Sequence, residues 1–155
     1  MVKWGMSSYK NYLPPIMCAG FIFILSLEVF GDKTTFGILH YLLGFVDASM
    51  SKHKMKEIDF YIRKTAHIVV YATLAVLWFR AFMKSGKSIP AAVFLTFTFS
   101  LLCAGLDEYH QSLVPGRTGL VSDVYIDITG AGTALVISAI KTKTRHAFES
   151  VNCKI

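Results

Sequence analysis

Long apolar runs interrupted by few charges constrain this chain more than any other feature of its sequence. A helix needs roughly 17 to 25 mostly apolar residues to cross the hydrocarbon core of a bilayer. Four segments come close to this requirement, at residues 13–31, 66–83, 89–106 and 120–140. Because 54% of the residues are hydrophobic and the mean hydropathy is +0.49, lipid suits such a chain better than water. We therefore predict an all-α integral membrane protein, a bundle of about four transmembrane helices that forms one domain over residues 1–155.

A fifth apolar stretch, residues 36–46, is too short to cross the bilayer. His40 and two glycines weaken it further as a span. It is either a short interfacial or re-entrant helix in the first loop or an ordinary helix packed on the bundle, because hydrophobic periodicity does not separate these two structures.

Basic residues flank the apolar runs and indicate an orientation. The formal net charge is +6, but the lysines and arginines form no basic stripe interleaved with aromatic residues, so no nucleic-acid partner is predicted. They lie before the first run, between the second and third, and after the fourth, as Lys3, Lys10, Arg80, Lys84, Lys87, Lys141, Lys143 and Arg145. Since basic loops tend to stay inside, both termini of a multi-pass protein are predicted to be cytoplasmic. The first loop is also rich in lysine and argues against this orientation, but long loops weigh less.

Ionisable residues concentrate at three span ends that an even number of spans places on one side of the membrane, the outer side. They are Arg63, Lys64, His67 and Tyr71 at the start of the second span, Asp107, Glu108 and Gln111 at the end of the third, Arg117 in the following turn, and Asp123 and Asp127 at the start of the fourth. Helical spacing puts Lys64, His67 and Tyr71 on one face. A charged side chain at membrane depth costs about 3 kcal/mol or more unless it is paired or hydrated. We therefore expect these residues to converge in the bundle interior or in a water-filled cleft.

At these positions the sequence resembles the VanZ-like family of bacterial membrane proteins, whose prototype is linked to low-level teicoplanin resistance. The pattern of this family looks like a series of elements in fixed order. A basic pair is followed by His and Tyr, then by Asp-Glu-x-x-Gln, by an Arg in the next turn, and by an Asp before a glycine-rich continuation. The matching residues are Arg63, Lys64, His67, Tyr71, Asp107, Glu108, Gln111, Arg117, Asp123, Gly130 and Gly132. Asp127 departs from the pattern, since the family usually carries Asn there. The resemblance implies an envelope protein of the bacterial cell membrane tied to glycopeptide tolerance, without implying a particular reaction.

The first function that fits these residues is an enzyme acting at the outer membrane face on a lipid-linked or acylated envelope substrate, by hydrolysis or group transfer. Its candidate catalytic residues are His67, Glu108, Asp107 and Asp123, and its candidate substrate-binding residues are Arg63, Lys64, Tyr71, Gln111, Arg117 and Asp127. Histidine is a general base or acid near neutral pH, and Lys64 and Arg117 suit a phosphate or carboxylate. No serine or cysteine stands in a nucleophile motif. Asp123 is either a nucleophile or, as is more common for an Asp at a helix start, a helix cap or a member of an ion pair.

The second function is a binding or transport module that recognises an anionic lipid headgroup or an acyl-glycopeptide with the same cations and breaks no bond. The residues also fit a closed salt-bridge network that only holds helix ends together. A metal site built from His67, His110, Asp107 and Glu108 is disfavoured, because these ligands lie on only two helices and lack HExxH spacing, so we predict no metal and no other cofactor. Glycines at 130 and 132 predict close helix packing, within the bundle or between the protomers of a homo-oligomer.

Overall fold

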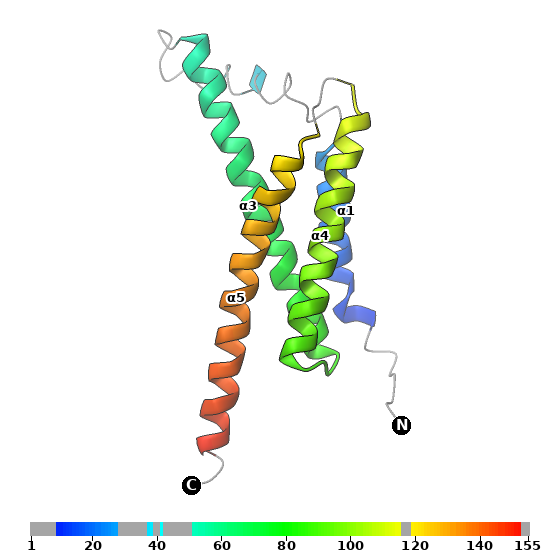
Figure 1. Ribbon diagram of the computed structural model, residues 1–155, viewed down its shortest axis with the longest axis vertical. Coiled ribbons are helices and arrows are strands. Elements are labelled where there is room, and N and C mark those ends of the chain that lie inside the picture. The colour runs from blue at the N-terminus through cyan, green and yellow to red at the C-terminus, as the bar shows by residue number, and fades with distance from the viewer. Residues whose placement is uncertain (1–8, 28–36, 39–40, 42–50, 116–118, 153–155) are drawn as a thin grey trace.

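The computed structural model describes residues 9–27, 37–38, 41, 51–115 and 119–152. Their elements are a short 3₁₀ turn, η1 (Tyr9–Asn11), and the helices α1 (Leu13–Leu25), α3 (Lys52–Lys84), α4 (Ile89–Leu113) and α5 (Val121–Asn152). The described part of the chain contains no strand, so the predicted all-α class is confirmed (Figure 1).

Three helices, α3, α4 and α5, are long and apolar enough to cross a membrane. They confirm the predicted multi-pass architecture. Helix α1 has 13 residues, fewer than the roughly 17 that a span needs. The predicted first span continues to Gly31, which lies outside the described residues, as does Glu28. The predicted count of four spans is therefore not confirmed. The interfacial or re-entrant interpretation of residues 36–46 also falls largely outside the described residues.

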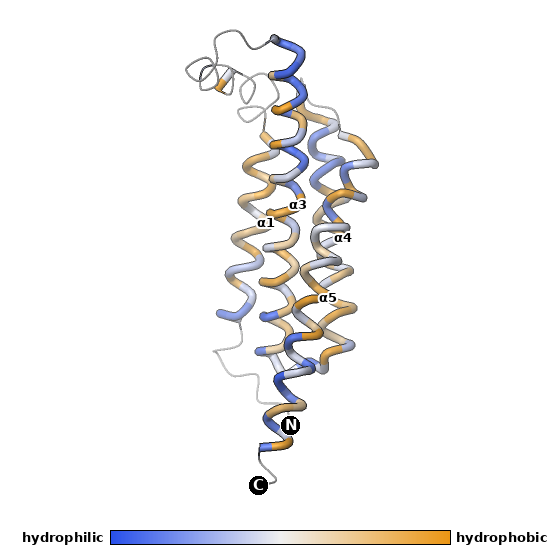
Figure 2. Tube along the Cα trace, turned by 90° about the vertical axis from the view of Figure 1, so that its left-hand side faces the viewer, coloured by the Kyte–Doolittle hydropathy of each residue, from blue (hydrophilic) through white to orange (hydrophobic). Residues whose placement is uncertain are grey.

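Helices α3 and α5 are both longer than the apolar runs that predicted them. Helix α3 begins at Lys52, because the hydroxyl of Ser51 accepts a hydrogen bond from the backbone N–H of Lys54 at 3.3 Å and caps the first turn. The lysine-rich segment before residue 66, predicted as loop, is thus helical. At 1.5 Å per residue, the 33 residues of α3 extend about 50 Å, well beyond a hydrocarbon core of about 30 Å. Figure 2 shows the hydrophilic end of α3 above the apolar middle of the bundle.

Helix α5 also continues past its predicted end, as far as Asn152. In this extension Arg145 Nε donates a hydrogen bond to Glu149 Oε1 at 2.8 Å, which lowers the pKa of the Glu149 carboxyl. Both side chains are exposed, and the pair fits the part of a long helix that leaves the membrane.

The four helices run antiparallel along the chain, with α1 and α4 pointing one way and α3 and α5 the other (Figure 1). The carboxyl ends of α1 and α4 therefore lie at the same end of the bundle as the amino ends of α3 and α5. This end is called the polar end below. It is where the sequence analysis expects the ionisable residues to meet.

The buried face of α4 explains how the polar end forms. Its first four members are small and fully buried, at spacings of four residues: Ala92, Thr96, Ser100 and Ala104. The same face continues into Asp107, Glu108 and Gln111, which are also buried. Since residues four apart share a face, the stripe that admits neighbouring helices carries two carboxylates into the bundle at its end. Large apolar side chains point outward from α4, as Phe94 does with 69% of its surface exposed, in keeping with contact with lipid.

Large side chains of α3 fill the opposite end of the bundle. Leu74 and Phe79 are buried there. Trp78 stacks on Phe99 of α4 with ring centroids 4.6 Å apart, and Tyr12 contacts Phe82 edge to face. This aromatic packing ties the segment before α1 and helix α4 to α3.

Helices α3 and α5 approach each other closely at Gly130, beside the polar end. A Cβ atom at this position would lie 2.5 Å from the backbone oxygen of Ile68, which is closer than real Cβ atoms come to other atoms. Only glycine fits this crossing. The predicted close packing is thus confirmed at Gly130, whereas a Cβ at Gly132 would meet nothing within 4 Å.

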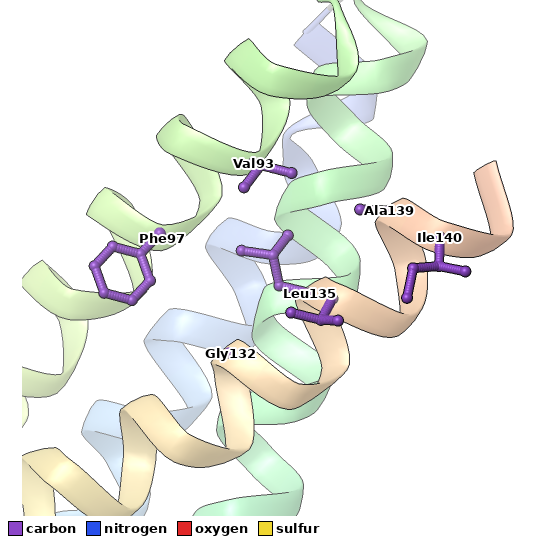
Figure 3. A pocket seen from close by; sticks show the side chains of 7 residues that line it. Val93, Phe97, Gly132, Leu135, Ala139 and Ile140 are labelled. Atoms are coloured by element: carbon purple, nitrogen blue, oxygen red, sulfur yellow. The ribbon is translucent and has the colours of Figure 1, made fainter. Parts of the chain in front are cut away.

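An apolar groove of about 420 Å³ lies between α4 and α5. Val93 and Phe97 of α4 line one side, and Leu135 and Ile140 of α5 line the other (Figure 3). Its residues lie on the parts of both helices that are farther from the polar end, within the apolar run of each.

Candidate functional site

Four ionisable side chains from three helices converge at the polar end. They are His67 of α3, Asp107 and Glu108 of α4 and Asp127 of α5, and each offers a nitrogen or oxygen atom within 4.8 Å of those of the others. We call these four residues the His–carboxylate cluster. The three carboxylates are buried, and the His67 side chain is 25% exposed. Residues separated by up to sixty positions therefore form one site, with the imidazole at its accessible edge.

His67 and Asp127 join α3 to α5 at this site. His67 Nδ1 lies 2.9 Å from Asp127 Oδ1. The other carboxylate oxygen, Oδ2, is buried and has no hydrogen-bond partner among the described residues. A carboxylate on one ring nitrogen fixes the orientation and tautomer of the imidazole. Asp127, which departs from the family pattern, is thus the direct partner of the histidine.

Asp107 is held by two neutral donors. The hydroxyl of Ser26, which follows α1, donates to Asp107 Oδ1, and Gln111 Nε2 donates to Oδ2 at 3.0 Å. Sequence reasoning missed Ser26. Its signal in the sequence was a lone hydroxyl near the end of an apolar run, and such a residue equally fits an ordinary helix end. The role of Ser26 depends on the packing of α1 against α4.

The side chain of Glu108 binds the backbone of Leu120, just before α5, and so links α4 to the start of α5. The backbone N–H of Leu120 donates to Glu108 Oε2 at 2.9 Å, and Gln111 Nε2 lies 3.5 Å from Oε1. A Cβ at Gly119 would lie 2.2 Å from the backbone oxygen of Glu108, so glycine is required where the connection meets α4. Gln111, predicted to bind substrate, donates to both acidic residues of its own helix.

Lys64 and Asp123 form an ion pair beside the His–carboxylate cluster. The Lys64 ammonium also lies 5.2 Å from the centroid of the Phe60 ring, within reach of a cation–π interaction. The Lys64 side chain is 20% exposed and that of Asp123 is 11% exposed. Asp123, a predicted catalytic residue, therefore lies opposite a lysine and not among the four clustered groups.

The remaining predicted residues occupy different surroundings. Arg63 forms an ion pair with Asp59 of its own helix, at 3.3 Å. Tyr71 is buried one turn beyond His67, and its hydroxyl has no hydrogen-bond partner. His110 packs its ring edge to face against Phe23 and does not belong to the cluster. Arg117 lies outside the described residues.

Comparison with known proteins identifies the family of the chain. A sequence model of the family described as VanZ/LLP1 matches residues 13–142. The chain belongs to the VanZ/LLP1 family. The match includes all four residues of the His–carboxylate cluster and confirms the VanZ-like resemblance seen in the motifs. No curated protein and no solved structure shows significant similarity to the chain.

The geometry of this VanZ/LLP1 site suits two kinds of chemistry. An imidazole oriented by a carboxylate is suited to proton transfer. Several carboxylates and an imidazole within a few ångströms are also suited to holding a cation. The Lys64–Asp123 pair has the form expected of a closed salt-bridge network. Within the described residues, however, one oxygen of Asp127 lacks a partner, so the hydrogen bonding of the cluster itself is incomplete there.

Proposed function

We propose that this chain is an envelope enzyme that acts on a lipid-linked or acylated substrate by hydrolysis or group transfer at the His–carboxylate cluster. The observation that carries the proposal is the contact of 2.9 Å between His67 Nδ1 and Asp127 Oδ1, with His67 partly exposed. A histidine held in this way on packed helices is positioned for general acid–base catalysis, which contributes about 10²- to 10⁴-fold to a rate.

In the proposed reaction, His67 removes a proton from water or from an acceptor hydroxyl. The oxygen forms a bond to the carbonyl carbon or phosphorus of the substrate, and the bond to the leaving group breaks. The imidazolium then returns the proton to the leaving group, so protons and charge balance. Asp127 orients the ring and stabilises its charged form, as a carboxylate does for a catalytic histidine.

Binding is assigned to the rim of the site. The partly exposed ammonium of Lys64 is suited to an anionic phosphate or carboxylate, and Arg117 is a second candidate on the basis of sequence alone. The apolar groove between α4 and α5 offers an acyl chain a hydrocarbon surface (Figure 3). Gly132, on its wall, is five residues along α5 from Asp127, a rise of about 7.5 Å. An amphiphile spanning both features has its polar group at the membrane edge.

The wider setting of this proposal is the outer face of the bacterial cell membrane, with both termini cytoplasmic. Action on an envelope lipid or an acyl-glycopeptide there would link the chain to glycopeptide tolerance, teicoplanin included. Family membership supports the envelope setting, and the three apolar helices support the membrane.

A binding or transport module is the second candidate function. The Lys64–Asp123 ion pair favours this function. An anionic ligand could displace the Asp123 carboxylate and pair with Lys64 in its place, and no bond would be broken. The module and the enzyme predict different effects of His67→Gln. Loss of the imidazole abolishes turnover in the enzyme but leaves a ligand held by Lys64 in place.

The experiment reconstitutes the purified protein in nanodiscs made from bacterial membrane lipids and follows the lipids by mass spectrometry. Wild type and the control His53→Gln, an exposed position in the first turn of α3, should consume the same lipid species. His67→Gln should consume it at least about 100-fold more slowly. Equal turnover by His67→Gln would overturn the assignment, and binding of a lipid that no variant consumes would favour the module.

A further inference from the structure

Among the residues that the structure describes, the His–carboxylate cluster holds three carboxylates and one basic side chain, His67. Asp107, Glu108 and Asp127 are 1%, 5% and 0% exposed, respectively. The donors to Asp107 and Glu108, which are Ser26, Gln111 and the backbone of Leu120, are all neutral. Lys64 is engaged by Asp123. Burying several carboxylates together is costly unless positive charge or protons neutralise them.

Asp127 also carries a buried oxygen that no described residue satisfies. Its Oδ2 has no hydrogen-bond partner in the described part of the chain, while its Oδ1 contacts His67. Most buried polar atoms in proteins are hydrogen-bonded or bind an ion or water, because an unpaired one costs about 1 to 3 kcal/mol. Asp127 is one of the four residues that offer ligand atoms within 4.8 Å of one another. The unpaired atom and the excess of carboxylates are two separate observations at one place.

We propose that the cluster binds one divalent transition-metal ion, with His67, Asp107, Glu108 and Asp127 as ligands. Imidazole with carboxylates suits ions such as Zn²⁺ or Mn²⁺. Ligand atoms sit about 2.0 to 2.2 Å from Zn²⁺ and hence roughly 3.4 Å from one another in a tetrahedral site. Side chains whose ligand atoms already lie within 4.8 Å reach this spacing by small rotations. The metal site considered from the sequence had ligands on only two helices. The ligands proposed here come from three helices, because Asp127 of α5 takes the place of His110.

The surroundings of the four side chains match a metal site in another respect. Gln111 donates to both Asp107 and Glu108, and the Ser26 hydroxyl donates to Asp107. Hydrogen bonds of this kind orient ligand carboxylates, and their loss typically lowers metal affinity by about 10- to 100-fold. Within the described residues, these donors leave Asp127 Oδ2 unpaired and therefore open to an ion.

This inference deepens the proposed function and shares its site. A bound ion lowers the pKa of a water ligand and polarises a carbonyl or phosphoryl oxygen. It would therefore replace the His67–Asp127 pair as the group that activates water. Ion binding is measured without substrate, so the two proposals fail independently.

The test is calorimetric titration of the chelator-treated, full-length protein in detergent micelles with ZnCl₂ and, separately, MnCl₂. Wild type and Glu149→Gln, which removes an exposed carboxylate of α5, should bind one ion of at least one metal per chain. Asp127→Asn should weaken binding at least about tenfold. Glu108→Gln serves as the second variant should Asp127→Asn not fold, as judged by size-exclusion chromatography and thermal unfolding. Absence of binding to wild type, or equal binding by a folded cluster variant, would overturn the proposal.

Turnover with and without chelator separates this inference from the proposed function. An ion that binds to a protein without lipid turnover leaves the metal site standing and removes the enzyme. Turnover that persists at full rate in chelator-treated protein leaves the enzyme standing and removes the ion from its reaction. Turnover that chelator abolishes and Zn²⁺ or Mn²⁺ restores supports the metal site and the enzyme, with the ion in place of His67 as the group that activates water.

Discussion

At the scale of single residues, the site depends on neutral donors that orient acidic groups. Asp107 is 1% exposed and accepts hydrogen bonds from Ser26 and Gln111, which lie on different helical segments. A buried hydrogen bond to a charged group contributes about 1.5 to 3 kcal/mol. Ser26 therefore does more than end α1: it ties α1 to the acidic end of α4.

Replacement of the Ser26 hydroxyl should be costly for stability. Ser26→Ala leaves Asp107 Oδ1 without its donor and should lower the free energy of unfolding by about 1 to 3 kcal/mol. Ser112→Ala is the matched control, because Ser112 is exposed and donates only to the backbone of Tyr109 on its own helix. Its effect should stay within about 0.5 kcal/mol. Denaturant titration in micelles measures both, and equal effects would remove the tie between α1 and α4.

Substitution at Lys64 should separate ligand binding from chemistry. Lys64→Gln removes the partly exposed cation of the rim and leaves the His67–Asp127 contact intact. We expect binding of anionic lipid to weaken about tenfold or more, since a charge-assisted hydrogen bond is lost. Flotation with vesicles of defined anionic lipid content would measure the change. Binding equal to that of wild type would assign the headgroup to other residues.

At the scale of helices, the approach of α5 to α3 positions the site. Gly130 lies three residues beyond Asp127, and the backbone of Ile68, next to His67, occupies the space that a side chain would need. The close crossing thus lies next to the contact between His67 and Asp127. A small-residue crossing of this kind is typical of packed transmembrane helices.

The two glycines of α5 should respond in opposite ways to alanine. Gly130→Ala must push α5 away from the Ile68 backbone, so it should destabilise the fold and lengthen the His67–Asp127 contact. Gly132→Ala meets nothing within 4 Å and should be neutral or stabilising, since alanine favours a helix over glycine by about 1 kcal/mol. Thermal unfolding in micelles compares them. Equal melting temperatures would contradict the close crossing.

The sequence predicted which polar side chains meet at one end of the bundle better than it predicted the extent of the helices. The spacing of Lys64 and His67 on one face, and of Asp107 and Glu108 at the end of an apolar run, indicated this meeting, because helical periodicity and the cost of charge in lipid act locally. Whether these residues form a functional site stays a prediction. Ser26 was missed because its partner is distant in the chain. The helical segment before residue 66 was missed because its charges masked a good helix with a serine cap. Arg63, expected to bind substrate, instead pairs with Asp59 one turn away on its own helix.

At the scale of the whole molecule, antiparallel packing gathers the polar residues at one end of the bundle (Figure 1). The turn between α3 and α4 lies at the other end, where Gly86 has a positive φ of 77°. The two ends should therefore face opposite sides of the membrane. Exposed positions at each end report on this arrangement.

Thiol labelling of intact cells should distinguish the two ends. In a cysteine-free background, Ser51→Cys before α3 and Val121→Cys at the start of α5 should react with an impermeant maleimide added outside. Gly86→Cys should react only after permeabilisation, because the proposed orientation places the α3–α4 turn inside. If Gly86→Cys is labelled from outside and the other two only after permeabilisation, the protein has the opposite orientation. If Ser51→Cys and Val121→Cys are labelled from opposite sides, the amino ends of α3 and α5 do not lie on the same side of the membrane, and the site cannot form as described.

The most direct measurement of the account is cross-linking between α3 and α5 at the site itself. His67→Cys with Asp127→Cys, in a cysteine-free background, replaces two side chains that contact each other at 2.9 Å. A short bifunctional thiol reagent should join this pair within one chain, as detected by mass spectrometry. His67→Cys with Ile140→Cys, about 20 Å farther along α5, should not be joined. Absence of the first cross-link, or equal yields for the two pairs, would contradict the convergence of distant ionisable residues in one pocket.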